Sequence, residues 1–145
     1  MKQEITVKAF FLSILLSIVL SSAMAYLGLY AGMTISASIP AAIMSMGILK
    51  LFRESNILEN NIVQTAASAG ESLAAGVIFT IPALLLIGYW DTIDYWEVTK
   101  IAMVGGILGA LFTVPLRRAL ILKANLKFPE GVATAAVLKT GHESD

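Results

Sequence analysis

The sequence predicts an all-α membrane protein, a polytopic bundle of about four membrane-spanning helices with a short helix near the C-terminus. Hydrophobic residues make up 57% of the 145 residues and charged residues only 14%, whereas a typical soluble domain carries about 25% charged residues. The charged residues also gather between long uncharged runs, as expected where only the connections between membrane helices meet water. One membrane domain over 1–145 is therefore expected.

The first uncharged run covers residues 9–49 and is long enough for two crossings of about 20 residues each. Its break is expected within 28–40, which is rich in Gly, Ser and Thr, so the first two helices should cover about 9–30 and 34–52. The N-terminus also resembles a signal peptide, but the apolar run continues past the small residues at 23–25. A retained first helix is favoured over a cleaved one.

Two further uncharged runs cover 73–90 and 101–116. With their flanking residues they predict a helix over 60–90, broken or kinked because Pro82 lies inside it, and another over 97–118.

A short last helix is expected over 129–139, because Pro129 suits a first helical position and Glu130 places an acid in the first turn. Discontinuous helices in transporters can point their amide-rich N-termini at an anionic group of the solute. A helix lying at the membrane interface fits the same residues, so both interpretations stay open.

The positions of the basic residues predict the orientation. Four crossings with both termini in the cytoplasm put nine of the ten Lys and Arg residues inside and only Lys100 outside, and cytoplasmic loops are enriched in these residues. A multi-pass protein of the cell membrane (inner or plasma membrane) is expected, with both ends cytoplasmic.

Polar side chains share one face of the helix expected after residue 60. At 100° per residue this face is about 140° wide, and its candidates for a substrate or proton pathway are Asn60, Asn61, Gln64, Ser68 and Glu71. An ionisable residue inside a membrane helix is a functional candidate by default, and Glu130 is a further one. The alternative is an amphipathic segment at the cytoplasmic interface, with Glu71 in water.

Four glycines predict close helix packing, since a pair spaced by three residues lets two backbones approach. These are Gly28 with Gly32 and Gly105 with Gly109.

Enzyme chemistry is not expected. The chain has no cysteine and one histidine, so thiolate catalysis, a Ser-His-Asp triad and a two-His metal site lack their residues. No metal site, cofactor or nucleic-acid partner is predicted. The lipid bilayer is the expected partner.

Six short segments follow one another through nearly the whole chain: YLGLYAGMT at 26–34, SIPAA at 38–42, ENNIVQTAASAGE at 59–71, FTIPA at 79–83, PLRR at 115–118 and FPEG at 128–131. Together they resemble the oligopeptide transporter (OPT) family in its prokaryotic branch. The resemblance implies secondary active, proton-coupled transport of oligopeptides or related small solutes. Members of this family have more than four membrane helices, so the chain resembles the amino-terminal portion of a larger transporter. Its partners would be a small peptide or related solute, protons, and the remaining helices of a longer chain or other subunits.

Two alternatives remain from the residues alone. One is a small four-helix membrane protein that self-assembles as an exporter, although the run at 9–49 lacks the acid that such a protein needs. The other is a structural or assembly subunit of the membrane without transport activity.

The orientation can be tested by labelling single cysteines, because the chain has none of its own. A cysteine replacing Asp94 should react with a membrane-impermeant maleimide only from outside, and one replacing Lys123 only from the cytoplasm. Reaction of the residue-94 cysteine from the cytoplasmic side alone would contradict the predicted topology.

Overall fold

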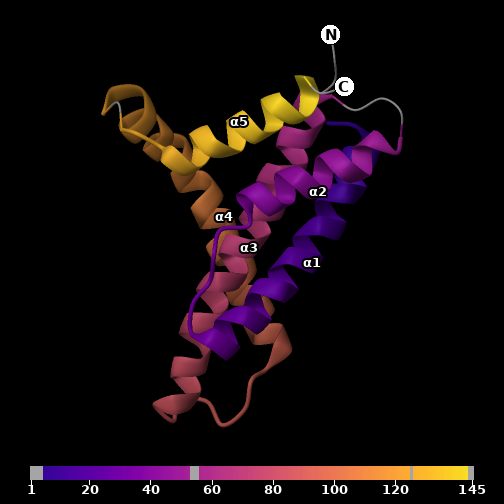
Figure 1. The fold of residues 1–145 in the computed structure, drawn as a ribbon. Helices are drawn as coiled ribbons and strands as arrows, with labels where there is room; N and C mark the ends of the chain where they lie inside the picture. Colours follow the sequence, from indigo (N-terminus) through magenta and orange to yellow (C-terminus); the bar gives the residue numbers. More distant parts are fainter. Residues whose placement is uncertain (1–4, 53–55, 125, 144–145) are drawn as a thin grey trace. The chain divides into compact units, whose positions relative to one another are not determined.

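The computed structural model describes residues 5–52, 56–124 and 126–143, and within them every regular element is a helix (Figure 1). The elements are α1 (Val7–Ala31), α2 (Ser38–Lys50), α3 (Ile57–Leu86), α4 (Tyr95–Leu116), the π-helix η1 (Arg117–Lys123) and α5 (Pro129–Glu143). This confirms the all-α class of the fold.

The chain divides into two compact units, one made of Met1–Ala75 with Pro129–Asp145 and the other of Gly76–Phe128. A single membrane domain over 1–145 stays a prediction.

Helix α1 is long and apolar enough to cross a membrane. Its 25 residues correspond to about 37 Å at 1.5 Å per residue, more than the ~30 Å of a hydrocarbon core. The Thr6 hydroxyl accepts a hydrogen bond from the amide of Ala9 (3.2 Å) and caps its start. Gly32 ends it with φ +71°, a left-handed conformation in which its amide donates to the carbonyl of Gly28 (2.9 Å).

The second predicted membrane helix is shorter than expected. Instead of 34–52, α2 covers 13 residues, or about 20 Å, and cannot cross a ~30 Å core alone. Pro40 accounts for the late start, because without an amide proton it cannot bond back to residue 36. Residues 33–37 are non-helical and turn back along α1 (Figure 1). Among the described residues, three helices rather than four are therefore long enough to span by themselves.

An extended segment can still complete the second crossing. Five residues add at most about 17 Å when extended, which with the ~20 Å of α2 exceeds the hydrocarbon thickness. A second crossing made of this segment and α2 stays a prediction.

Helix α3 runs unbroken from Ile57 to Leu86, with Pro82 inside it. Its start is a capping box: the Asn56 side chain accepts from the amide of Leu58 (3.3 Å), and the Glu59 carboxylate accepts from the amide of Asn56 (3.3 Å).

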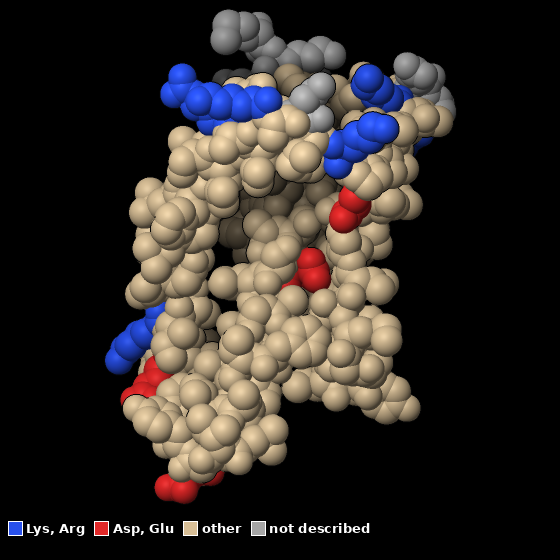
Figure 2. Space-filling view, turned by 90° about the vertical axis from the view of Figure 1, so that its left-hand side faces the viewer, with Lys and Arg blue, Asp and Glu red and all other residues tan. Residues whose placement is uncertain are grey.

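In the unit that holds residues 76–128, α4 begins at Asp94, whose carboxylate accepts from the amides of Trp96 (2.8 Å) and Glu97 (3.0 Å). With η1 it forms the third helix of spanning length, Tyr95–Lys123. No residue of α4 is buried in the described structure. Figure 2 shows one face of the molecule, and most of the residues on it are uncharged. A surface that contacts lipid or another membrane helix needs such a composition.

Leu16, Leu49 and Val63 are fully buried in the core of the first unit.

Helix α3 approaches α1 closely at Gly70, which faces two serines. A Cβ atom added to Gly70 would lie 1.9 Å from the Ser17 hydroxyl oxygen and 3.2 Å from that of Ser21. Glycine therefore allows this contact between the two helices.

Replacing Gly70 by valine should destabilise the protein by about 1–3 kcal/mol, the usual cost of overpacking. The control is Gly76→Val on the same helix, where an added Cβ meets nothing within 4 Å. Thermal unfolding in detergent measures both, and equal melting temperatures for the two variants would contradict the close contact.

Candidate functional site

The predicted polar face of α3 is divided between two environments. Its members Asn60, Gln64 and Glu71 are buried, Ser68 is half-buried, and Asn61, Thr65 and Ser72 are exposed. The buried members share one side with the core residues Val63 and Ala67. Glu71, at 5% exposure, thus lies inside the first unit of the chain.

Asn60 joins α3 to α2. The fully buried Ser45 hydroxyl lies 3.1 Å from the Asn60 side-chain oxygen, to which it donates, and 2.9 Å from the Ala42 carbonyl. Gln64 accepts a longer bond from the Thr65 hydroxyl (3.4 Å).

Glu71 differs from these amides because its carboxylate has no hydrogen bond or ion pair among the described residues. Burial of an unpaired carboxylate costs several kcal/mol, and the cost falls when the group takes up a proton or meets a cation. Ser68 lies three residues earlier, on the preceding turn of α3. The place of Glu71 in a substrate or proton pathway stays a prediction.

A chain of hydroxyl groups leads from Ser68 to Glu130. The Ser68 and Ser38 hydroxyl oxygens lie 3.0 Å apart, those of Ser38 and Ser36 3.2 Å apart, and Ser36 also donates to the Glu130 carboxylate. We call Ser36, Ser38 and Ser68 the serine chain. It connects α3, the extended segment before α2 and the first turn of α5.

The first turns of α2 and α5 meet at the serine chain, because Ser38 opens α2 and Glu130 lies in the first turn of α5. The positive ends of two helix dipoles therefore lie together here. Sequence analysis found Ser68 and Glu130 but missed Ser36 and Ser38. The feature of the sequence that could have indicated Ser36 and Ser38 is the Ser-rich stretch before Pro40.

A second polar cluster surrounds Glu59, which is 3% exposed. Its carboxylate accepts from the Thr6 hydroxyl (2.5 Å) and lies 3.8 Å from the Lys8 ammonium. Because it also caps α3, it fastens the start of α3 to the start of α1. Sequence analysis did not single out Glu59, although the Asn56-x-x-Glu59 spacing of a capping box was visible.

The four packing glycines have few contacts in the described residues. Gly28 is buried within α1, whereas Cβ atoms added to Gly32, Gly105 and Gly109 would meet nothing within 4 Å. Their role in packing stays a prediction.

The described residues hold no group of three His, Cys, Asp or Glu side chains that could bind a metal ion. His142 is exposed near the end of α5.

The three helices of spanning length among the described residues are typical of a multi-pass helical membrane protein. The chain matches the OPT oligopeptide transporter protein family over residues 4–145. It is 52% identical over 110 residues to a protein of Haemophilus influenzae named "Putative oligopeptide transporter". The chain belongs to the OPT oligopeptide transporter family, as the sequence segments indicated.

The matched stretch covers 76% of this chain but 17% of that relative, so the chain spans about a sixth of its length. No solved structure gives a significant match. Because the family is one of transporters, it points away from an enzyme.

Replacing Glu59 by alanine should lower the free energy of unfolding by about 2 kcal/mol, because hydrogen bonds to a charged group are lost. Asp91→Ala is the control, since this exposed acid should change stability by no more than about 0.5 kcal/mol. Thermal unfolding in detergent compares them. A Glu59→Ala variant as stable as the control would show that the cluster contributes nothing.

Proposed function

We propose that this chain is part of a secondary active transporter that moves oligopeptides or related small solutes across the cell membrane, coupled to protons. Membership in the OPT family supports the transport of peptides. The observation that supports coupling to protons concerns Glu71. Its side chain is buried on α3, a helix of membrane-spanning length, and its carboxylate has no partner among the described residues.

Glu71 carries the proton in this proposal. A protonated carboxyl is neutral and tolerates a water-poor site, whereas the ionised form needs water or a cation. In this proposal the Glu71 carboxyl alternates between two states. In one it is protonated, and in the other it is ionised and meets water or the ammonium group of the solute. This alternation would link proton movement to solute movement.

The serine chain provides the polar surface for the solute. Each hydroxyl both donates and accepts hydrogen bonds, so Ser36, Ser38 and Ser68 can bind peptide amides and carbonyls or pass a proton between Glu130 and the turn before Glu71. The two helix N-termini beside them favour an anionic group such as a peptide carboxylate. Asn61 faces outward on α3 and would contact helices from the rest of the transporter.

The transporter lies in the inner or plasma membrane with both ends of this chain in the cytoplasm. The nine-to-one distribution of basic residues supports this orientation. Since the matched stretch covers 17% of the relative, the remaining chain would supply further helices of the pathway.

In the full-length transporter, Glu71→Gln should reduce proton-driven peptide uptake by about tenfold or more, equivalent to at least ~1.4 kcal/mol. Glutamine keeps the size and hydrogen-bonding capacity of glutamate but cannot take up a proton. Uptake is measured against pH in proteoliposomes at matched protein amounts.

The matched control is Glu97→Gln, which removes an exposed acid and should leave uptake unchanged. If Glu71→Gln transports at the wild-type rate with the same pH profile, Glu71 does not carry the proton.

A further inference from the structure

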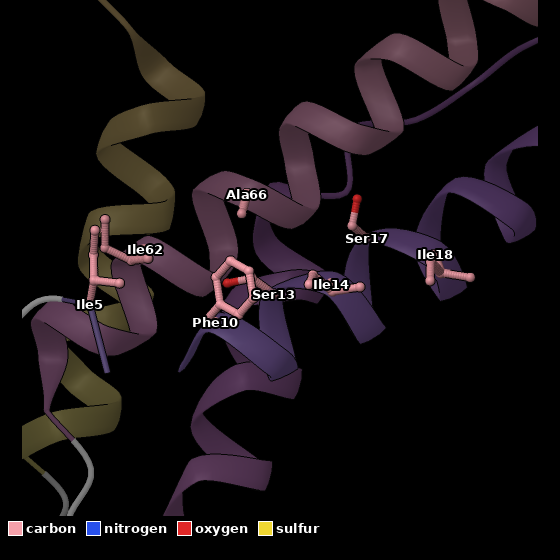
Figure 3. A pocket seen from close by; sticks show the side chains of 8 residues that line it. All are labelled: Ile5, Phe10, Ser13, Ile14, Ser17, Ile18, Ile62 and Ala66. Atoms are coloured by element: carbon pink, nitrogen blue, oxygen red, sulfur yellow. The ribbon is translucent and has the colours of Figure 1, made fainter. Parts of the chain in front are cut away.

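A groove runs along the outside of the first unit between α1 and α3 (Figure 3). Its volume is about 370 Å³. Phe10, Ile14 and Ile18 lie along the α1 side and are 45–61% exposed, while Ile62 and Ala66 line it from α3. Its base contains two hydroxyl side chains, Ser13 and Ser17. The groove is thus apolar at its edges and polar at two points of its base.

Ser13 has an unused hydroxyl. The side chain is 8% exposed, and its oxygen has no hydrogen-bond partner among the described residues. Other hydroxyls on the long helices bond the carbonyl four residues earlier, at 2.7–2.8 Å: those of Ser22, Thr65, Thr80, Thr99 and Thr113. Ser13 does not use this local solution, and because its oxygen is itself buried, the hydroxyl would bond a group in the groove after rotation of the Ser13 side chain.

The residues at the base are small. Ser13 and Ser17 lie one turn apart on α1, and Ala66 faces them from α3. Small residues at such spacing let a further helix approach closely, and hydroxyls at such contacts bond across helices. From Phe10 to Ile18 the groove follows about 12 Å of α1, or a little more than two helical turns.

We propose that this groove is the seat of a further membrane-spanning helix from the remaining chain of the transporter. That helix presents a small side chain to the base and a hydrogen-bonding group, either a polar side chain or a backbone carbonyl, to Ser13. The inference rests on the proposed function, in which this chain is one part of a longer transporter.

Two considerations favour this occupant. A lipid acyl chain would fill the apolar edges but offer the Ser13 hydroxyl nothing to bond, and an unpaired polar group in hydrocarbon is costly. The matched stretch is 17% of the relative, and a helix joined covalently to the groove is present at a high effective concentration. A second copy would have to associate from the free membrane.

Photo-cross-linking in the full-length transporter tests the proposal. The photoreactive residue p-benzoylphenylalanine replaces Phe10, which lines the groove, or Phe11, which is 66% exposed, lies 100° further around α1 and does not line it. In native membranes, position 10 should link to a residue beyond 145 of the same polypeptide, identified by mass spectrometry. Position 11 should give mostly lipid adducts.

A groove-filling variant provides the second measurement. Ser13→Leu combined with the probe at position 10 should abolish most of the internal cross-link, whereas Ser22→Leu should keep it, because Ser22 does not line the groove. If the Ser13→Leu variant does not fold, the cross-links formed from position 10 in the transporter that keeps Ser13 still test the proposal.

Lipid adducts at position 10 equal to those at position 11 would overturn the proposal in favour of an acyl chain. Cross-links to a second copy would overturn it in favour of a dimer contact. The readout is independent of uptake, so the helix seat can stand if Glu71 fails its test, and the reverse also holds.

Discussion

Polar groups in hydrocarbon must find partners inside the protein, and this constraint explains most of the structure. It selects helices, whose backbones satisfy themselves, and it favours side chains that bond the amides left free at helix starts. Thr6, Asp94 and the Asn56–Glu59 pair close helix starts. Glu59, which is buried, has three partners: the Thr6 hydroxyl, the Asn56 amide and the Lys8 ammonium. Against this background the Glu71 carboxylate and the hydroxyls of Ser13 and Thr134 lack a partner among the described residues, and the proposed function gives Glu71 a chemical task.

The same constraint applies to the non-helical residues 33–37 that precede α2. An extended segment leaves amides and carbonyls unbonded, so it must lie against protein or water rather than lipid. Helix α5 packs beside α2, as the approach of Gly141 to Met46 shows. It also brings Ser36 to Glu130, although 94 positions separate them in sequence. One irregular segment thus creates the polar centre of the first unit.

Sequence reasoning succeeded where the physics is local. Uncharged runs located α1, α3 and α4 because bilayer thickness sets helix length, and Pro129 with Glu130 marked the start of α5. It failed where the answer depends on which surfaces meet. The polar face of α3 looked uniform, but packing buries Glu71 and exposes Asn61. Likewise the close contact of Gly70 with Ser17 of α1 could not be predicted, because spacing along one helix does not show which residue of another helix lies opposite.

The length of α3 has a consequence for the membrane around it. Its 30 residues extend about 45 Å, roughly 15 Å more than the hydrocarbon of a typical bilayer. The excess must be absorbed by tilt, by projection of the polar start into the headgroups, or by local thickening of the bilayer. Each response places Glu71 at a different depth. If Glu71 carries the proton as proposed, lipid chain length would act on transport through the depth of a single carboxyl group, and bilayer thickness would be a physical variable of the activity.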